Sequence, residues 1–213
     1  MLDLVREVRI AVCYVYPLVN QRVYFPLAQR FCDTWRKHPG HSLHVLCNGG
    51  NPGPMDQRPF AGLTQSFHTC SNVGWDIGAF QWACESIPCD LLVCLGAPVH
   101  FYRSGWLDKM VDAYLEYGPG LYGCAAYLSP NWHVRTTSFA MPPELLSSYP
   151  YEIGSTRASR YFFEHGSGSF TRHVLELGFP CVMVTWKGCF PFDQWRDHAP
   201  NRDEILVRDQ HIH

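Results

Sequence analysis

The 213-residue sequence lacks a strong charge of either sign and lacks any long hydrophobic run. Its formal net charge is -2 and charged residues make up 17%, so no basic field is available to wrap a nucleic-acid backbone. The longest apolar runs, such as Leu91 to Leu95, are far shorter than the roughly 20 residues of a membrane helix. Residues Met1 to Arg9 carry charges of both signs and no apolar core, which is not typical of a signal peptide. We expect a folded cytoplasmic protein with no nucleic-acid partner and no membrane span.

Cysteine is abundant, but the spacing that marks a metal or redox motif is missing. The ten cysteines include no CxxC pair, and Cys84, Cys89 and Cys94 are spaced too widely for a zinc knuckle. Several of the others lie in apolar runs, where cysteine behaves as a small buried hydrophobic residue. Because no export signal is present, we expect reduced thiols.

The motifs of several nucleotide-binding and hydrolytic classes are also missing. A dinucleotide oxidoreductase needs GxGxxG after its first strand, where this chain has Val15-Tyr16-Pro17-Leu18-Val19-Asn20. An α/β-hydrolase needs GxSxG, but Phe170 stands where the last glycine of that pattern would follow Gly166-Ser167-Gly168-Ser169. No GxxxxGK[ST] loop of a P-loop kinase occurs either.

What is present is an alternation of short apolar, β-branched runs with segments of helical periodicity. This alternation favours a mostly parallel sheet covered by helices, in one domain. The expected strands are Val8 to Tyr16, Ser42 to Cys47, Ser66 to Cys70, Leu91 to Leu95, Leu121 to Tyr127, His133 to Met141 and Cys181 to Trp186. The expected helices are Asn20 to Lys37, Ile77 to Ser86, Ser104 to Tyr117 with Ser104 as N-cap, Pro142 to Ser148, and Ser169 to Gly178. The very apolar Leu91 to Leu95 should be central, and Pro191 to His213 should form a covering tail.

The strand exits are the candidate binding site, because open α/β sheets bind ligands beyond the carboxyl ends of their strands. Asp76 follows a turn of Asn and Gly at the start of a helix, where it is either a simple N-cap or a ligand-binding carboxylate. Aromatic residues at these exits can stack on a base or sugar, although such residues more often belong to the core. The candidate donor-binding residues at the exits are Tyr14, Tyr16, Asn48, Asn72, Trp75, Asp76, Gly96 and Ala97.

Three of these exits occur in an order that resembles a known superfamily. A first strand ending in Tyr14-Val15-Tyr16-Pro17 is followed by Asn72-Val73-Gly74-Trp75-Asp76-Ile77-Gly78-Ala79 and then by Leu91-Leu92-Val93-Cys94-Leu95-Gly96-Ala97-Pro98-Val99. This order resembles the GT-A glycosyltransferases over essentially the whole chain. Within this superfamily it is more specifically similar to the N-terminal glycosyltransferase domain of a multidomain glycan-assembly protein of chlorella viruses.

The resemblance implies an α/β GT-A fold, that of nucleotide-diphospho-sugar transferases, with a mostly parallel central sheet of about six strands flanked by helices. It implies a hexosyltransferase-type enzyme that moves a sugar from a nucleotide-sugar, foremost a UDP-sugar, to a hydroxyl of a glycan or glycoprotein acceptor. It further implies viral glycan synthesis in a host cytoplasm, with residues 1–213 as one domain that can be the N-terminal part of a longer protein.

The sequence departs from this superfamily at the place of its metal ligands. The strand equivalent to Leu91 to Leu95 normally exits into Asp-x-Asp, which holds Mn²⁺ or Mg²⁺ on the diphosphate, whereas this chain has Gly96-Ala97-Pro98. Either the metal is held by fewer protein groups or it is dispensable. Asp76 is the substitute candidate, as a metal ligand or a ribose contact. The C-terminal His211 and His213 are further metal candidates, unless these terminal imidazoles do nothing.

The acceptor side of such an enzyme needs a base that deprotonates an alcohol. Glu164 is the candidate, because it stands beside the Gly/Ser-rich turn Gly166 to Ser169, and partial burial among its aromatic neighbours would raise its pKa. A solvated loop carboxylate is the alternative. Asp193 and Asp209 are weaker candidates for the same role, and His165 can orient the acceptor.

The growing negative charge of a leaving nucleoside diphosphate calls for cationic partners. Arg157, Arg160 and Arg208 are the candidates, with ordinary surface arginine as the alternative for each. A second function also fits the sequence: a catalytically degenerate GT-A domain that binds a sugar nucleotide or glycan without turnover. The missing Asp-x-Asp motivates that alternative.

Overall fold

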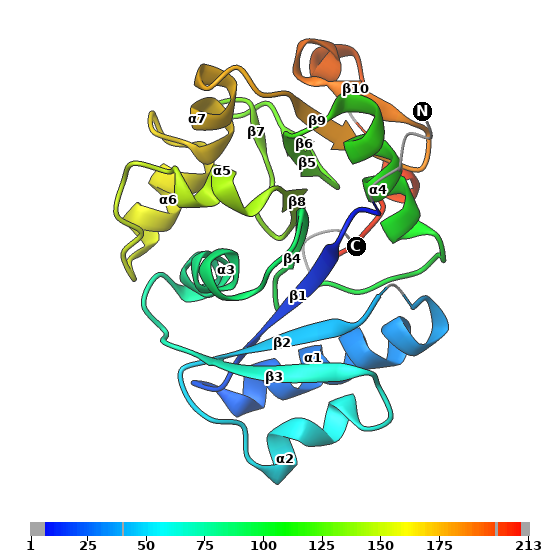
Figure 1. Ribbon diagram of the computed structural model, residues 1–213, viewed down its shortest axis with the longest axis vertical. Helices are drawn as coiled ribbons and strands as arrows, with labels where there is room; N and C mark the ends of the chain where they lie inside the picture. Colours follow the sequence, from blue (N-terminus) through cyan, green and yellow to red (C-terminus); the bar gives the residue numbers. More distant parts are fainter. Residues whose placement is uncertain (1–6, 40, 199, 210–213) are drawn as a thin grey trace, which may run out of the picture.

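The computed structural model describes residues 7–39, 41–198 and 200–209. Over these residues the chain forms an eight-stranded sheet in the order β10-β9-β5-β8-β4-β1-β2-β3 (Figure 1). A separate two-stranded sheet joins β6 and β7. The strands are β1 (Ile10–Pro17), β2 (Leu43–Asn48), β3 (Gln65–Cys70), β4 (Leu91–Leu95), β5 (Leu121–Gly123), β6 (Ala126–Tyr127), β7 (His133–Val134), β8 (Ser138–Met141), β9 (Cys181–Val184) and β10 (Cys189–Pro191).

Most strands of the large sheet run in one direction. The β1–β2, β2–β3, β1–β4 and β5–β9 pairs are parallel, whereas β8 is antiparallel to both β4 and β5, and β10 is antiparallel to β9. The expected α/β class with a mostly parallel sheet is confirmed, although the sheet has more strands than the six expected. Strand β4 is buried along its whole length and lies inside the strand order, as its apolar sequence predicts.

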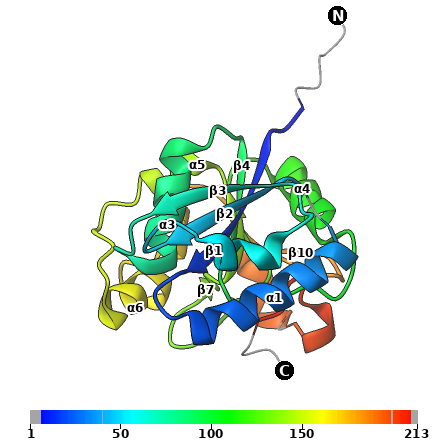
Figure 2. The ribbon, with the colours of Figure 1, turned by 90° about the horizontal axis from the view of Figure 1, so that it is seen from below.

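Helices cover both faces of the sheet. One face packs against α1 (Gln21–Lys37) and α4 (Trp106–Tyr117), and the other packs against α3 (Trp75–Ser86), α5 (Pro143–Ser147), α6 (Arg157–His165) and α7 (Phe170–Glu176). Figure 1 and the turned view in Figure 2 show the strands between these helices. A short α2 (Pro54–Gln57) and three 3-10 helices, Arg58–Phe60, Phe192–Asp197 and Arg202–Glu204, complete the described elements.

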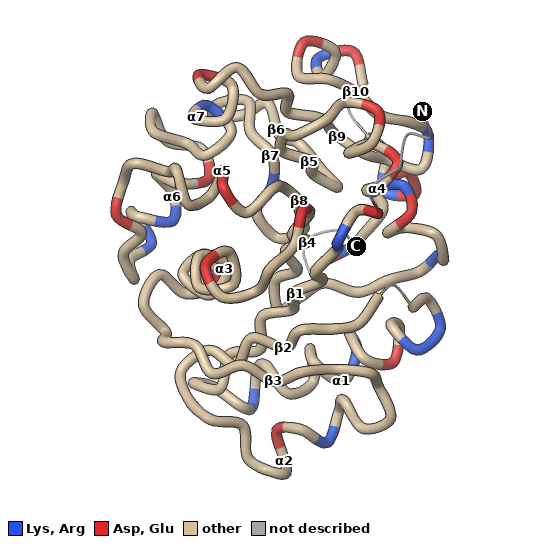
Figure 3. Tube along the Cα trace, viewed as in Figure 1, with Lys and Arg blue, Asp and Glu red and all other residues tan. Residues whose placement is uncertain are grey.

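Within the described ranges, no helix is long and apolar enough to cross a membrane. Acidic and basic residues are interspersed along the described trace and do not gather on one side (Figure 3).

Helix α1 shows how the sequence pattern leads to both the core and the site. Phe31 and Trp35 are buried, and the Phe31 ring stacks on Tyr14 of β1 with ring centroids 3.8 Å apart. Val23 continues the same stripe about two turns before Phe31 but is 50% exposed. Leu27, between them, lies at the border and lines a pocket together with Val23.

Several local expectations were wrong. The N-cap of α4 is Gly105, with φ of 83°, and Ser104 instead contacts Nδ1 of His38 through its hydroxyl, at 3.0 Å. The segment after Pro191 was expected to be a covering tail, but over its described residues it adds buried side chains to the core, with Trp195 1% and Leu206 0% exposed. Helix α6 was not expected at all.

Candidate active site

The exits of four strands meet at one edge of the sheet. The parallel registers pair Pro17 with Asn48 and Asn48 with Cys70, so β1, β2 and β3 end side by side. Strand β8 starts at this same edge, since Ser138 pairs with Leu95, the last residue of β4. The loop residues 135–137 before β8 therefore come to the carboxyl ends of the parallel strands, where a fold of this type binds ligands.

A pocket of about 530 Å³ lies at this edge, and its walls differ in chemistry. One wall is apolar and comes from the start of α1 and the loop before it. The opposite wall is polar and comes from α3, α6 and the loop before β8. The lining residues are Val15, Pro17, Val19, Val23, Tyr24, Leu27, Asn48, Asn72, Trp75, Asp76, Ala97, Pro98, Arg135, Thr137, Arg160 and Glu164.

The turn between β3 and α3 places Asp76 in the pocket. Gly74 is the N-cap of α3 and adopts φ of 72°, a conformation that favours glycine. A Cβ at Gly78 would lie 1.9 Å from the carbonyl oxygen of Val73. Because glycine has no Cβ, the backbone of Val73 can pack directly against Gly78, and this close contact makes the turn tight. Asp76 lies in the first helical turn and is not the N-cap. Its Oδ1 accepts the Ile77 N–H at 3.1 Å, at the end of the helix where negative charge is favoured.

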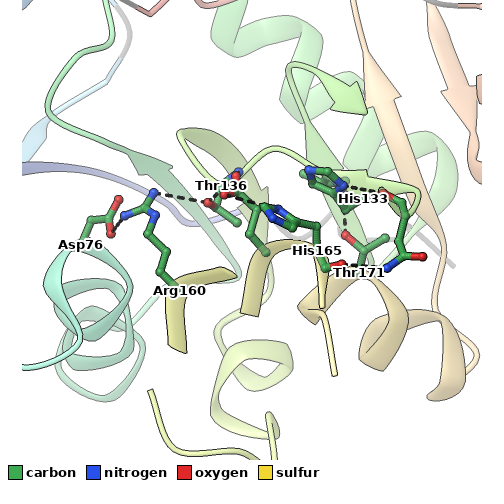
Figure 4. A network of polar contacts seen from close by, with 9 residues as sticks. Asp76, His133, Thr136, Arg160, His165 and Thr171 are labelled. Carbon is green, nitrogen blue, oxygen red and sulfur yellow. Dashed lines mark hydrogen bonds and ion pairs between the residues drawn. The ribbon is translucent and has the colours of Figure 1, made fainter. Parts of the chain in front are cut away.

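Arg160 of α6 forms an ion pair with Asp76 and links the two helices. Its NH2 group also lies 3.5 Å from the hydroxyl of Thr136, and Figure 4 shows the guanidinium between Asp76 and Thr136. Burial opposes the charge of this guanidinium, but attraction from Asp76 and then from Glu164 outweighs burial and raises the pKa of Arg160. Arg160 is therefore a fixed cation inside the pocket.

Glu164, one turn further along α6, faces the same pocket. Its Oε1 accepts two hydrogen bonds from Thr136, one from the backbone N–H at 3.2 Å and one from the hydroxyl at 2.9 Å. Its Oε2 lies 4.0 Å from Nδ1 of His165. The side chain is 19% exposed. Thr136 thus fixes one carboxylate oxygen, and the other oxygen is the one positioned to meet a substrate.

A second cation, Arg135, is held at the exit of β4. Its NH2 group lies 2.8 Å from Oδ2 of Asp209, and its NH1 group donates to the Tyr127 hydroxyl at 3.2 Å. The Thr137 hydroxyl donates to the same Asp209 oxygen at 2.9 Å. The Asp209 side chain is 2% exposed and that of Arg135 is 10% exposed. Asp209 therefore lies behind the pocket wall, and we infer that it holds the Arg135 side chain in position.

The most buried polar side chain of the pocket has an oxygen atom without a hydrogen-bond partner among the described residues. Asn48, at the end of β2, is 1% exposed, and its Oδ1 atom is buried without a hydrogen bond from any described residue. Leaving such a buried acceptor unsatisfied costs roughly 1 to 3 kcal/mol. Asn48 lines the pocket, so a ligand N–H would satisfy this oxygen once the side chain turns it toward the pocket space.

The structure brings together seven of the residues expected from the sequence, and it adds others. Gly96 lies beside the pocket, where its N–H donates to the Thr137 carbonyl at 2.8 Å. The apolar α1 wall was missed, and Arg135 was not expected as a cationic partner of the ligand. The seven expected residues that line the pocket are Asn48, Asn72, Trp75, Asp76, Ala97, Arg160 and Glu164.

Tyr14 and Tyr16 are core residues and do not line the pocket. Both are 0% exposed, and their hydroxyls donate to the Ala97 carbonyl at 3.0 Å and to Oε1 of Gln21 at 3.1 Å. Burial raises the pKa of Tyr14 well above its ordinary value and that of Tyr16 to about 12. Both side chains point into the packed layer between the sheet and α1, where no base or sugar can stack on them.

Three other expected residues lie away from the pocket. Arg157 is exposed at the start of α6, one turn before Arg160, and Asp193 is exposed in the 3-10 helix Phe192–Asp197. Arg208 packs over the Tyr102 ring at 3.9 Å and binds Asp203 at 2.6 Å. The expected metal ligands His211 and His213 lie outside the described residues.

The described residues do not fit a divalent metal site. They contain no group of three or more His, Cys, Asp or Glu side chains arranged to hold an ion. Asp76 is the carboxylate nearest to the role, and it is already paired with Arg160. A divalent ion about 5 Å from that guanidinium would be repelled by roughly 6 to 7 kcal/mol at an effective dielectric constant near 20. We therefore derive no step through a metal.

Comparison with known proteins identifies the fold. No family model and no curated protein matches the sequence, so the viral resemblance stays a prediction. Among solved structures, a Bacillus anthracis protein described as a glucose-1-phosphate thymidylyltransferase is similar at 10% identity and TM-score 0.54, over 80% of this chain and 84% of that one. The chain has a nucleotide-diphospho-sugar transferase fold.

Two further structures support that assignment. The 2-C-methyl-D-erythritol 4-phosphate cytidylyltransferase of Thermus thermophilus shares 14% identity at TM-score 0.52, with 83% of this chain and 88% of that chain covered. A CMP:2-keto-3-deoxy-manno-octonic acid synthetase complexed with CTP shares 8% identity at TM-score 0.52, with 80% and 87% covered. At these identities the likeness is one of fold.

Proposed function

We propose that the protein is a glycosyltransferase that moves a sugar from a nucleotide-sugar, specifically a UDP-sugar, to a hydroxyl of a glycan acceptor. The observation that carries the proposal is the composition of one pocket. It holds an amide-lined recess at Asn48 and Asn72, suited to a nucleoside, together with the carboxylate of Glu164 and two arginines. A sugar-transfer enzyme needs these three features in one cleft.

The recess at the ends of β2 and β3 supports a uridine donor. A uracil ring carries an N–H between two carbonyl groups, which can donate to the unpartnered Oδ1 of Asn48. Trp75 lines the same recess and offers a ring face for stacking. Asp76, at the N-terminus of α3, is placed to accept a ribose hydroxyl through the oxygen that Ile77 and Arg160 do not bind.

Glu164 supports the acceptor half of the reaction. In the proposed step the acceptor oxygen forms a bond to the anomeric carbon while the bond from that carbon to the phosphate oxygen breaks. The electron pair of the broken bond leaves with the nucleoside diphosphate. The acceptor proton passes to Oε2 of Glu164, because Oε1 is held by Thr136.

Two rival functions each have an observation in their favour. A degenerate domain that binds a nucleotide-sugar without turnover is favoured by the replacement of Asp-x-Asp with Gly96-Ala97-Pro98. A nucleotidyltransferase is favoured by the fold, but it must bind a triphosphate, usually on a glycine-rich loop. The loop between β1 and α1, Leu18 to Asn20, has no glycine, which favours sugar transfer.

Isothermal titration calorimetry against a panel of nucleotide-sugars tests the proposal. UDP-linked sugars should bind, and GDP- or CMP-linked sugars should bind much more weakly, as the resemblance to UDP-sugar enzymes implies. Equal affinity across the three nucleotides would contradict the uridine assignment. Conversion of UTP and a sugar 1-phosphate to a UDP-sugar and pyrophosphate would instead establish the nucleotidyltransferase.

A further inference from the structure

Two cations line the pocket, Arg135 and Arg160, and the described residues contain no group of carboxylates arranged to hold a metal ion. The two arginines come from different parts of the chain, the loop before β8 and helix α6. Both share the pocket with Asn48 and Glu164, and Figure 4 shows Arg160 between Asp76 and Thr136, the residue that binds Glu164. In the proposed reaction, this is where the diphosphate of the donor would lie.

Each arginine is fixed by a carboxylate: that of Asp209, which does not line the pocket, for Arg135, and that of Asp76, which does, for Arg160. Asp209 and the Tyr127 hydroxyl hold the NH2 and NH1 groups of Arg135, and Asp76 holds the NH1 group of Arg160. A guanidinium has five N–H donors in a planar fork, so one held at an edge by a carboxylate still offers donors to a second anion. The fixed fork also loses little rotamer freedom on binding.

We infer that Arg135 and Arg160 bind the donor diphosphate directly and take over the role that a divalent ion would have at this edge of the sheet. The inference rests on the proposed function and goes beyond it, because it makes donor binding independent of metal. Asp209 is then a positioning residue. It keeps the Arg135 guanidinium in the pocket, and its own side chain does not line the pocket.

The chemistry of the two groups supports this assignment. A diphosphate presents several equatorial oxygens, which match two planar forks better than one point charge. The charge that develops on the leaving phosphate in the proposed reaction would fall between groups that are already oriented. No reorganisation would then be needed at the moment of transfer.

The test compares UDP with uridine as calorimetric ligands of the whole chain, because uridine reports the nucleoside recess alone. In excess EDTA the wild type should bind UDP at least roughly tenfold more tightly than uridine, since charged hydrogen bonds contribute that much or more. Excess MnCl₂ should change the UDP dissociation constant by less than about threefold. A preference for UDP that appears only with MnCl₂ would overturn the inference.

Variants locate the preference on the two arginines. Arg160→Gln should lower the ratio of uridine to UDP dissociation constants by about tenfold, and Arg135→Lys should lower it as well because a single ammonium cannot replace the fork. Arg135→Lys is used because removing the charge would take away the arginine that pairs with the buried carboxylate of Asp209, which risks unfolding. The control Arg172→Gln, in an exposed pair with Glu176 on α7, should leave the ratio unchanged.

The outcomes separate this inference from the function on which it rests. A folded wild type that binds uridine and UDP equally in EDTA would overturn the arginine assignment and leave the uridine recess standing. The arginine assignment would also be overturned if Arg160→Gln and Arg135→Lys both keep the wild-type ratio of uridine to UDP dissociation constants. A folded wild type that binds neither uridine nor UDP would overturn the uridine assignment itself, and the inference with it.

Discussion

Glu164→Gln is the substitution that separates chemistry from binding. The amide keeps the shape of the side chain, and its oxygen can still accept the two hydrogen bonds that Thr136 donates at 3.2 and 2.9 Å. What changes is Oε2, which becomes an NH₂ group and can no longer accept a proton. General-base catalysis contributes roughly 10²- to 10⁴-fold to rate, equal to about 2.7 to 5.5 kcal/mol of barrier.

The assay measures kcat for sugar transfer together with the calorimetric dissociation constant of the donor. We expect kcat to fall by about 10²-fold or more while donor affinity changes by less than about threefold, because Glu164 acts on the acceptor. Glu176→Gln is the matched control, since that exposed glutamate of α7 carries the same change far from the chemistry. A loss in kcat below about tenfold would argue against the role of general base.

Product analysis by NMR of the anomeric centre completes this test. If configuration is retained, the acceptor proton can pass to the leaving phosphate, and a smaller loss in Glu164→Gln is then expected. Inversion with near-normal turnover in the variant would exclude Glu164 as the base.

Three further predictions concern donor binding, the turn before α3 and pH. Asp76→Ala should weaken donor binding measured by calorimetry, because it frees the Arg160 guanidinium from its position; unchanged affinity with an intact circular dichroism spectrum would reduce Asp76 to a structural residue. Gly78→Ala should lower the free energy of unfolding by about 1 to 3 kcal/mol or more, since its Cβ would lie 1.9 Å from a backbone oxygen; an unshifted urea midpoint would refute this. Burial, then the neighbouring His68, lowers the pKa of His44, and burial lowers that of His68. Above the ordinary pKa of 6.5 both imidazoles are neutral in the folded and the unfolded chain, and the contribution of the pair to stability is complete. Below pH 6.5 the unfolded chain binds protons more readily than the folded chain, so this contribution is lost. The urea midpoint should therefore be lower at about pH 5.5 than at about pH 7.5, and this decrease should be smaller in His44→Phe.

The sequence predicted the parts of the fold that depend on local pattern. The apolar run of β4 predicted a central strand, and the alternation of strands and helices predicted where the exits meet. Asn48, Asp76 and Glu164 could be found because each lies at or beside a recognisable strand end or turn. Periodicity and strand composition carry this information in adjacent residues.

The pairings that complete the site depend on tertiary contacts that no local pattern encodes. Helix α6 is an exception, because its sequence is strongly amphipathic and the Thr156 side chain accepts the Ser159 N–H as an N-cap, so usable local signals were present. Asp209 bonds to Thr137 from 72 positions away, a contact that a single sequence does not reveal. The burial of Tyr14 likewise depends on where α1 packs.

The central claim is turnover of a nucleotide-sugar in this pocket, and proton NMR of a UDP-sugar incubated with the protein tests it most directly. The account predicts that UDP and the free or transferred sugar accumulate, in EDTA as well as with MnCl₂, and that Glu164→Gln slows this accumulation. Tight binding of UDP-sugars without cleavage, whether water or an added glycan is the acceptor, would contradict the claim and identify a binding domain without turnover.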